Sequence, residues 1–469
     1  MKTNFLYVML LSVLFLACKG KTDQKPVTTS NSDTKNKAGA QIEIAKGKTT
    51  TAKFLSLSDV HINGDMTETQ FGNVSGTQLW SRTKTKIEAV VKQEQPKFMV
   101  YLGDLPAYID SERAQNTHLM LENLRSLQIG IPILYLPGNN DSLEGDYHSF
   151  TNGNGNSVLT EDENVSNNWP IINSSSTVIR AHNLDFNKEF GYYSVDLVDN
   201  GSTLKVIALN TVIFSNKKEK DSVNGKLVIH PMYNSKQNAQ HEYVTGDDGI
   251  SQQQATQDQM TWFETTMQGL GPNDRVMLMM HIPIGLDSYG GKPMWNQALT
   301  FKDLSGTEHS LHNGFIDIIE KYKPNITGLL NGHTHTDGLR RIYKSHNSNQ
   351  SSDMISFSIS TPGIAVNHDN NPAFKIFTYN SSNFDLLDFK TYYASPTNTA
   401  QNGDFKYDST STYTFSSVYG VTNPNVTIFS TLANESNADV IQHVNETLGA
   451  MSNQDVKMVH DDAVDVHKN

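Results

Sequence analysis

The chain has 469 residues, which is long enough to bury a large core and to hold more than one domain. Its formal net charge is −12 at pH 7, so it offers no basic surface to a nucleic-acid backbone, and we expect no nucleic-acid partner. It contains one cysteine, which excludes a fold held together by disulfides within the chain.

The N-terminal segment, residues 1–18, has the pattern of a signal peptide. Lys2 gives a basic start, residues 5–17 are almost wholly apolar, and Cys18 follows directly. The apolar run is too short to span a membrane as a helix and fits the central part of a secretory signal. The segment resembles a bacterial lipoprotein box, in which Cys18 becomes the lipidated N-terminus. We therefore expect an exported lipoprotein, anchored to a membrane in the periplasm or at the cell surface; an ordinary signal peptide is the alternative.

Residues 19–50 are rich in Lys, Thr, Ser, Asn and Gln and poor in apolar side chains. Such a composition cannot bury enough apolar surface to fold. We predict a disordered tether that holds the following domain away from the membrane.

Strand-like and helical patterns alternate between residues 51 and 398. Apolar residues at helical spacing predict helices over residues 79–93, 260–270 and 314–322. Short apolar runs predict strands over residues 54–57, 98–102, 131–136, 276–280 and 326–330, and later over 355–359, 374–379 and 386–393. The alternation predicts an α/β domain over residues 51–398, in which the late strands complete the second sheet of a sandwich.

Two polar regions interrupt or follow this pattern. Residues 215–248 read as an inserted loop with a solvated charge run, and a place at the border of a cleft is the alternative interpretation. Residues 399–469 read as a small, mainly helical C-terminal extension. Its end carries Asp461, Asp462 and Asp465 between two histidines, and we interpret it as a frayed, solvated terminus, with metal chelation as the alternative.

Residue types that bind metals follow directly after five of the predicted strands. The five blocks are Asp59-Val60-His61, Gly103-Asp104, Gly138-Asn139-Asn140-Asp141, His281, and Gly332-His333-Thr334-His335. Carboxylate, imidazole and amide groups make a site for hard or borderline divalent cations. The ends of strands in an open α/β sheet gather at one crevice, so we expect the blocks to meet.

Seven candidate ligands with one shared carboxylate are enough for two metal ions. The candidates are Asp59, His61, Asp104, Asn139, His281, His333 and His335. Asp104, which follows Gly103, is the best candidate for the bridging carboxylate. Two ions about 3.5–4 Å apart polarise a phosphoryl group and activate a bridging water, so we expect hydrolysis of a phosphate ester by attack of a metal-bridging hydroxide.

An isolated histidine is more often a structural residue than a ligand. Only the joint occurrence of the five blocks makes the ligand role the better interpretation for the four histidines within them. His118, His309, His312 and His368 lack such a context, and we interpret them as structural or surface residues. His148 is also interpreted in this way, although it lies seven residues after Asp141 and so remains a candidate proton donor.

The five blocks resemble those of the calcineurin-like metallophosphoesterase superfamily, which are D-x-H, G-D, G-N-H-[DE], a lone H and G-H-x-H. The segments 103–107, 280–285, 360–363 and 371–374 are similar to those of its acid sphingomyelinase-like phosphodiesterases. The resemblance implies a four-layer αββα core and two divalent ions, usually zinc, with manganese or iron as alternatives. It places one ion on Asp59, His61, Asp104 and His335, and the other on Asp104, Asn139, His281 and His333.

The sequence departs from this family at two positions near the ligands. Asn140 stands where the third block of the family has a histidine, and Tyr108 stands where a histidine usually follows G-D-x-x-A. A general acid typically contributes about 10²–10⁴-fold to a rate, so alkoxide leaving groups should react slowly unless another residue supplies the proton. Fungal endopolyphosphatases are similar here, since they also carry G-N-N-D. The candidate catalytic residues are therefore Asp104, His281, Asn140 and His148.

These features predict a monomeric, binuclear metal-dependent phosphodiesterase. Its expected substrate is an exported or extracellular phosphodiester, either a phosphocholine-type lipid such as sphingomyelin or a nucleotide-like molecule. Two alternatives stay open. One is a hydrolase of polyphosphate, other phosphoanhydrides or phosphomonoesters, and the other is a catalytically weak metal-binding lipoprotein.

Overall fold

The computed structural model describes most of the chain from residue 51 onward. The described residues are 41–43, 51–62, 67–68, 74–151, 157–158, 170–172, 183–199, 202–223, 226–237, 243–245, 251–288, 291–346, 348–366, 368, 370–396, 405–451 and 463–468. The predicted signal peptide, with Cys18, lies outside them. Among the described helices, none is both long enough and apolar enough to cross a bilayer.

The predicted tether, residues 19–50, also lies almost wholly outside the described residues and there stays a prediction. One part of its range is described. Residues Gln41–Glu43 form strand β1, which pairs in parallel with β9 (Tyr193–Asp199).

One sheet of the described structure has seven strands. Their order is β25 (Thr412–Thr414), β22 (Leu386–Tyr393), β21 (Ala373–Asn380), β2 (Thr51–Leu57), β5 (Met99–Tyr101), β6 (Ile133–Tyr135) and β7 (Ile171–Ile172). Strands β2, β5 and β6 are parallel, with Leu55 beside Met99 and Met99 beside Ile133. Their carboxyl ends therefore lie at the same edge.

The other sheet has nine strands among the described residues. The order starts with β1 and β9 and continues with β10 (Ser202–Leu209), β15 (Arg275–Met280), β18 (Ile326–Asn331), β20 (Met354–Ser360), β19 (Gly338–Tyr343) and β26 (Asp465–Val466). Strand β8 (Asp185–Phe186) pairs with β9 outside this order. The run from β10 through β15 and β18 to β20 is parallel. The five strands that precede the ligand blocks are thus β2, β5 and β6 of one sheet and β15 and β18 of the other.

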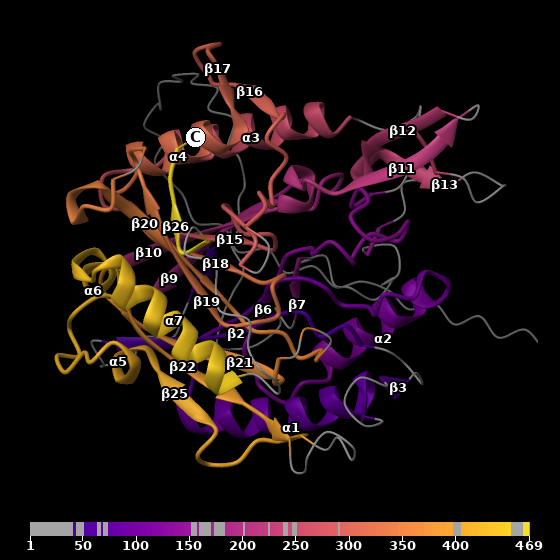
Figure 1. Ribbon diagram of the computed structural model, residues 1–469. Helices are drawn as coiled ribbons and strands as arrows, with labels where there is room; N and C mark the ends of the chain where they lie inside the picture. The colour runs from indigo at the N-terminus through magenta and orange to yellow at the C-terminus, as the bar shows by residue number, and fades with distance from the viewer. Residues whose placement is uncertain are drawn as a thin grey trace, which may run out of the picture. The chain divides into compact units, whose positions relative to one another are not determined.

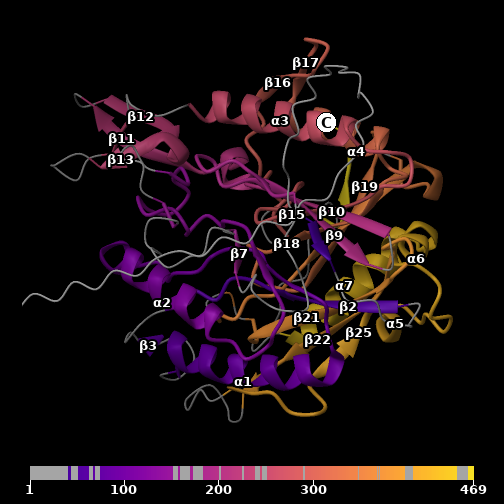
Figure 2. The same ribbon diagram turned by 180° about the vertical axis from the view of Figure 1, so that it is seen from behind.

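The two sheets pack face to face, and helices cover their outer faces (Figure 1). Helices α1 (Gly76–Glu94) and α2 (Arg113–Arg125) cover the seven-stranded sheet, whereas α3 (Gln252–Gln268) and α4 (Leu311–Lys321) cover the nine-stranded sheet. The view from behind shows the same separation (Figure 2). This is the four-layer αββα arrangement that the resemblance implied.

The alternation of side chains along the strands builds these layers. In β2, Phe54 belongs to the core between the sheets, whereas its neighbours Leu55 and Leu57 pack with residues of α1 and α2. Successive side chains of a strand point to opposite faces, so strands buried on both faces are apolar throughout. That pattern explains why these strands appear in the sequence as continuous apolar runs.

The three predicted helices exist, and each begins earlier than the apolar spacing indicated, at Gly76, Gln252 and Leu311. Ser251 caps α3 by accepting a hydrogen bond from the backbone N–H of Gln254, and Ser310 caps α4 through Asn313. A serine at this position satisfies a backbone donor that the helix cannot. The first turn of α3 carries mostly polar side chains and therefore shows no apolar periodicity, whereas α4 begins with the buried Leu311.

The C-terminal extension is part of both sheets. It contributes β25 to one and β26 to the other, and its helices α5 (Phe415–Val418), α6 (Ile428–Asn434) and α7 (Asn437–Met451) follow β25. Ile428 and Val440 belong to the core between the sheets. The interpretation of a frayed end is wrong for residues 463–468. Asp465 is buried and accepts hydrogen bonds from Arg341 at 2.7 and 2.8 Å, because a buried guanidinium requires a carboxylate partner.

The segment 215–248, predicted as a loop, forms two hairpins in its described part. Strand β11 (Lys218–Val223) pairs with β12 (Lys226–Pro231), and β13 (Ser235–Gln237) pairs with β14 (Tyr243–Thr245). The remaining short elements are β3 (Thr67–Glu68), β4 (Val74–Ser75), β16 (Thr300–Lys302), β17 (Glu308–Ser310), β23 (Ser395–Pro396), β24 (Phe405–Lys406), and the 3₁₀ turns Asp110–Glu112, Thr211–Phe214, Met232–Asn234 and Ser351–Asp353.

Candidate metal centre

The five ligand blocks meet where the carboxyl ends of both sheets come together. Within one sheet, the backbone N–H of Asp59 donates to the carbonyl of Gly103 at 3.0 Å. Within the other, Gly332 donates to the carbonyl of His281 at 3.1 Å. The N–H of His333 then donates to Oδ2 of Asp59 at 3.0 Å and joins the two sheets. The predicted convergence of the blocks is therefore present in the structure.

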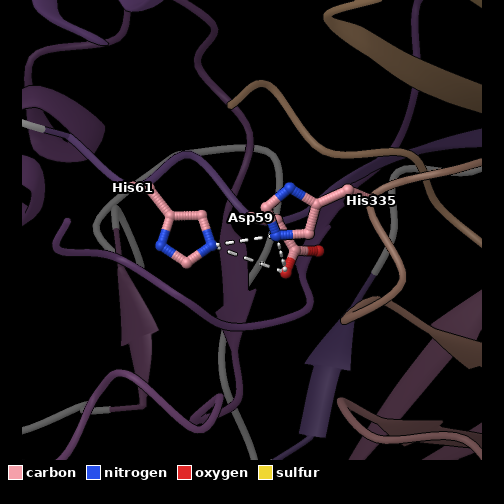
Figure 3. Close-up of side chains that lie close together, drawn as sticks. All are labelled: Asp59, His61 and His335. Atoms are coloured by element: carbon pink, nitrogen blue, oxygen red, sulfur yellow. Dashed lines mark hydrogen bonds and ion pairs between the residues drawn. The ribbon is translucent and has the colours of Figure 1, made fainter. Parts of the chain in front are cut away.

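Four of the predicted ligands form a first set. Nε2 of His61 lies 3.1 Å from Nε2 of His335 and 3.3 Å from Oδ2 of Asp104. Oδ1 of Asp59 lies 3.4 Å from Nε2 of His335 and 3.9 Å from Nε2 of His61. Figure 3 shows the side chains of Asp59, His61 and His335 pointing toward one another. All of these side chains are buried.

The remaining three ligands surround Asp104 from the other side. Oδ1 of Asn139 lies 2.9 Å from Nε2 of His281 and 2.8 Å from Nδ1 of His333. Oδ2 of Asp104 lies 3.4 Å from Nε2 of His281, as well as close to His61. This oxygen therefore lies close to donor atoms of both sets.

The donors fit divalent cations. Oδ1 of Asp59 is buried and has no hydrogen-bond partner, although a buried carboxylate oxygen is normally paired. The ligand atoms of Asp59, His61 and His335 lie within 4.8 Å of one another, as do those of Asp59, Asp104 and His281. A set of imidazole nitrogens and carboxylate oxygens suits zinc, iron or manganese. A cation between these atoms would give the unpaired oxygen its partner.

Backbone carbonyls hold two of the histidines in the form that binds a metal. Nδ1 of His61 donates to the carbonyl of Pro106 at 3.0 Å, and Nδ1 of His281 donates to the carbonyl of Leu102 at 2.6 Å. A carbonyl can only accept, so each Nδ1 carries a proton and each Nε2 is the atom left to bind a metal ion. Such partners fix the tautomer and the orientation of a ligating imidazole.

Asp141 fixes the two turns that carry Asp104 and Asn139. Its carboxylate accepts hydrogen bonds from the backbone N–H groups of Asp104 at 2.9 Å, Leu105 at 2.7 Å and Gly138 at 2.7 Å. The sequence placed Asp141 in the third block but gave no reason to assign it a role. The structure shows that it acts through the backbone of the ligands.

Asn140 lies against the shared carboxylate. Its backbone N–H donates to Oδ1 of Asp104 at 2.8 Å, and its side-chain Nδ2 donates to Oδ2 at 3.0 Å. Arg113 donates to the carbonyl of Asn140 on the other side. Asn140 is fully buried, so its amide orients Asp104.

Burial of several carboxylates in one place shifts their protonation. Burial, opposed by His281 and assisted by the nearby charge of Asp104, raises the pKa of Asp59 to about 7. Burial opposes the charge of both Asp104 and His281, but their mutual attraction overcomes it. The pKa of Asp104 is held well below its usual range and the pKa of His281 is raised to about 10, so a metal ion at Nε2 of His281 would have to displace a proton. Burial lowers the pKa of His61 to about 4, which leaves the imidazole neutral, as a metal ligand must be.

A family model described as calcineurin-like phosphoesterase matches residues 52–337, more than half of the chain. The chain belongs to this family. The phosphoesterase is a hydrolase, and its fold implies divalent metals at the ligand clusters described above. The matched region includes all five ligand blocks.

The relatives of the phosphoesterase include proteins named as acid sphingomyelinase-like enzymes. It is 29% identical over 167 residues to cyclic GMP-AMP phosphodiesterase SMPDL3A of Rattus norvegicus. The matched residues make up 35% of this chain and 34% of that protein. It is 23% identical to sphingomyelinase phosphodiesterase C of Dictyostelium discoideum, over 72% of this chain and 66% of that protein. The matches thus span about a third to two thirds of these relatives. A dimetal phosphatase from Danio rerio superposes with a TM-score of 0.41 at 11% identity, over 72% of this chain and 95% of the other.

A cavity of about 750 Å³ opens onto the metal centre of the phosphoesterase. The candidate ligands Asp104, Asn139, His333 and His335 are among the residues that line it. Its walls are formed by Tyr108, Asp146, Tyr147, Ser215, Asn216, Lys217, Ile282, Asp287, Lys292, Pro293, Met294, Thr334 and His368. Residues 215–217 come from the start of the polar segment, so that segment does border the cavity.

Two histidines outside the ligand blocks have different surroundings. His368, interpreted as a structural or surface residue, lines the cavity, and its ring centroid lies 4.4 Å from that of the ligand His335. Its segment follows β20 without a recognisable motif, so the sequence gave no sign of this place. His148, the candidate proton donor, is buried beside the carbonyl of Asp146 at 2.9 Å and is not among the residues that line the cavity.

Proposed function

We propose that this phosphoesterase is a binuclear metal-dependent phosphodiesterase that acts on an exported or extracellular phosphodiester. The single observation that carries the proposal is the place of Oδ2 of Asp104 between two sets of donor atoms. Asp59, His61 and His335 form one set, and Asn139, His281 and His333 form the other. Oδ1 of Asp59 lies 3.9 Å from Nε2 of both His61 and His281, so this carboxylate also borders both sets. One carboxylate shared by two sets of donors is the arrangement that a pair of ions requires.

Asp59, His61, Asp104 and His335 would hold one ion, and Asp104, Asn139, His281 and His333 would hold the other. When bound, the ions polarise the phosphoryl oxygens and lower the pKa of a bound water toward neutrality. The chain itself supplies rigid positions for the ligands. Asp141 and Asn140 keep the carboxylate of Asp104 in one orientation, and a rigid arrangement lets charge develop on the phosphoryl group without reorganising the site.

The walls of the cavity bear on the class of substrate. The exposed Lys217 and Lys292 line it, and Nζ of Lys217 lies 5.0 Å above the ring of Tyr147. Two ammonium groups beside the metal centre suit a substrate with negative charge beyond the phosphoryl group under attack. The relatives are named as phosphodiesterases of a cyclic dinucleotide and of sphingomyelin, which supports a phosphodiester of either class.

Phosphoanhydrides such as polyphosphate are the second candidate. The two lysines favour a substrate with several negative charges, and the amide of Asn140 cannot supply a proton to a leaving group. A phosphate leaving group needs no such proton. Export through the signal peptide and anchoring at Cys18 would place either substrate outside the cytoplasm.

The test is to measure metal content and activity on the same preparation. The purified full chain should bind about two divalent ions, lose activity when a chelator removes them, and recover it on reconstitution with zinc, manganese or iron. Activity is assayed with an aryl phosphodiester, a phosphocholine diester, a dinucleotide and polyphosphate, so that the substrate class is read from the same panel. A chain that hydrolyses these substrates equally well after complete removal of metal would refute the proposal.

A further inference from the structure

A row of polar side chains crosses four neighbouring strands of the seven-stranded sheet. Ser56 of β2 pairs with Lys375 of β21, Lys375 pairs with Thr391 of β22, and Thr391 pairs with Tyr413 of β25. Directly paired residues of adjacent strands point to the same face of a sheet. Phe54, two positions before Ser56, belongs to the core between the sheets, so this polar row also faces the other sheet.

The polar row contacts the nine-stranded sheet at two places near the last ligand block. Nζ of Lys375 donates to Oδ2 of Asp337 at 2.6 Å, and the hydroxyl of Tyr413 donates to the same oxygen. Oγ of Ser56 lies 2.6 Å from Oγ1 of Thr361. Asp337 lies two residues after the last ligand block, and Thr361 directly follows β20. The row therefore connects the two sheets beside the metal centre.

The charges of the pair between Lys375 and Asp337 are buried. Lys375 is fully buried and Asp337 is 4% exposed. Lys375 also donates to Oγ1 of Thr391 at 2.8 Å, and its Nζ lies 3.8 Å from the ring centroid of Phe389. Removing two charges from water costs free energy, and an apolar pair of similar volume is often equally stable or more stable in such a place. The stability of the fold alone therefore does not account for this pair.

His335 depends on its backbone for its orientation. Its Nδ1 is buried, and no hydrogen-bond partner for this atom lies among the described residues, whereas backbone carbonyls accept from Nδ1 of His61 and of His281. The φ angle of His335 is 58°, and a residue keeps such a conformation only where its surroundings hold it. On one side, its carbonyl accepts from the N–H of Gly363 at 3.0 Å. Further along the chain, the next anchored side chain is that of Asp337, which the polar row holds.

We propose that Asp337, Lys375 and Tyr413 are positioning residues for the first metal position, an inference that rests on the binuclear site proposed above. They hold the backbone after His335 against the sheet that carries the first ligand block. Nε2 of His335 is thereby kept 3.1 Å from Nε2 of His61, ready to share an ion with it. Because Tyr413 lies on β25, the C-terminal extension takes part in metal binding, although none of the seven candidate ligands belongs to it.

The experiment uses the full chain, stripped of metal with a chelator and titrated with zinc in a calorimeter. His335→Ala shows which of the two zinc dissociation constants belongs to the first position. The double variant Asp337→Asn, Lys375→Met removes both buried charges together. In this variant the constant of the first position should rise about 10–100-fold, the loss that follows from removing a partner of a ligand, while the other constant stays unchanged.

A second buried ion pair provides the matched control. Arg341 and Asp465 lie 2.7 Å apart in the nine-stranded sheet, away from the ligand blocks. The double variant Arg341→Met, Asp465→Asn should keep both zinc constants, and thermal unfolding of the metal-free proteins shows that each variant is folded. An equal loss of zinc affinity in this control would indicate general damage to the fold and would overturn the inference.

Tyr413→Phe decides the case in which the first double variant does not fold. It removes one hydroxyl from the C-terminal extension and should raise the same constant by about tenfold. An unchanged constant of the first position in every variant of the polar row that folds overturns the positioning role and leaves the binuclear site standing. A wild type that binds no zinc overturns the binuclear site itself, and the role of the row with it.

Discussion

The metal centre and the wall of the cavity are built in different ways. The ligands follow buried parallel strands within a few residues, and backbone carbonyls fix the rings of His61 and His281. The wall is formed largely by segments between elements, such as residues 215–217 and 292–294, and its two lysines are exposed. The strands therefore fix the positions of the metal ligands. The wall, which contacts the rest of a substrate, is formed by segments that can change without moving a ligand.

Mutations can test whether the metal centre and the cavity wall act independently. A change in the centre should alter metal content and the turnover of every substrate. A change in the wall should leave the metal in place and alter the turnover of some substrates only.

Asp104→Asn should have the largest effect. The substitution keeps the shape of the side chain but removes the charge that both donor sets share, so metal content should fall together with activity. A loss of roughly a thousand-fold in kcat corresponds to about 4 kcal/mol of transition-state stabilisation. Asp287→Asn, a change in a carboxylate of the wall, is the control and should retain both ions. An Asp104→Asn protein with full metal content would contradict the shared-carboxylate arrangement.

Substrates with different leaving groups test whether a residue of the centre or the wall protonates the departing oxygen. Asn140 contacts Asp104 with an amide, and His148 does not line the cavity, so neither provides a proton there. Aryl diesters and anhydrides should then be cleaved faster than alkyl diesters by roughly 10²–10⁴-fold, the typical contribution of a general acid. The measurement is kcat/KM for matched aryl and alkyl phosphocholine diesters.

Equal rates for the two diesters would show that another group assists the departing oxygen. His368 lines the cavity and is the first residue to examine. His368→Asn would then slow the alkyl diester more than the aryl diester.

Asp141→Asn should weaken metal binding without removing a ligand. Its carboxylate accepts three backbone hydrogen bonds, and the amide nitrogen of asparagine would face one or more of those N–H groups. Metal affinity should fall by about 10–100-fold, and the melting temperature of the metal-free protein should also decrease. Calorimetric titration with zinc and thermal unfolding measure the two effects. Unchanged zinc affinity would mean that the turns hold their shape without Asp141.

The meeting of the five ligand blocks could be predicted from the sequence because their residue types and their places after strands are local properties. Each ligand block follows a short apolar run, and β2, β5, β6, β15 and β18 are the strands expected. The conformation of the ligands was not predictable in the same way. Asp59, His61 and Asp104 have φ angles of 49°, 45° and 64°, and His333 and His335 have 71° and 58°. Non-glycine residues seldom adopt positive φ, and such strain collects at functional sites, so propensity gives no sign of it.

The glycines before the ligands show a related difference. Of Gly103, Gly138 and Gly332, only Gly103 has a positive φ, at 98°. Gly138 and Gly332 are required for space, because a Cβ atom would overlap Oδ1 of Asp104 in one case and Oγ of Ser58 in the other. Contacts between segments distant in sequence decide this.

Helix α2, the C-terminal end and the cavity wall could not be predicted, because their places also depend on contacts between distant parts of the chain. Helix α2 buries Arg113, Asn116 and Thr117 beside its apolar residues, so its pattern has no clear apolar face. The place of Asp465 depends on Arg341, more than a hundred residues earlier. Lys217 and Lys292 were brought together by the fold, and no spacing within the chain connects them.

Removal of the wall lysines should have the smallest effect. It tests most directly whether the wall acts independently of the metal centre. Lys217→Ala and Lys292→Ala each remove one exposed positive charge near the metal centre. KM for polyphosphate or a dinucleotide should rise by about tenfold, which is about 1.4 kcal/mol, while an aryl diester without further charges should be hydrolysed as before. Added salt should reduce the difference between variant and wild type, because exposed charges are screened.

Lys302→Ala is the matched control for these two variants, since Lys302 is exposed on β16 and does not line the cavity. Metal content should be the same in all of these proteins. If Lys217→Ala instead lowers kcat for every substrate equally, the lysine acts on the metal centre, which it can reach through the ring of Tyr147 and the hydroxyl contact of that ring with His333. The wall and the centre would then form one functional unit, and substrate preference could not change independently of the chemistry.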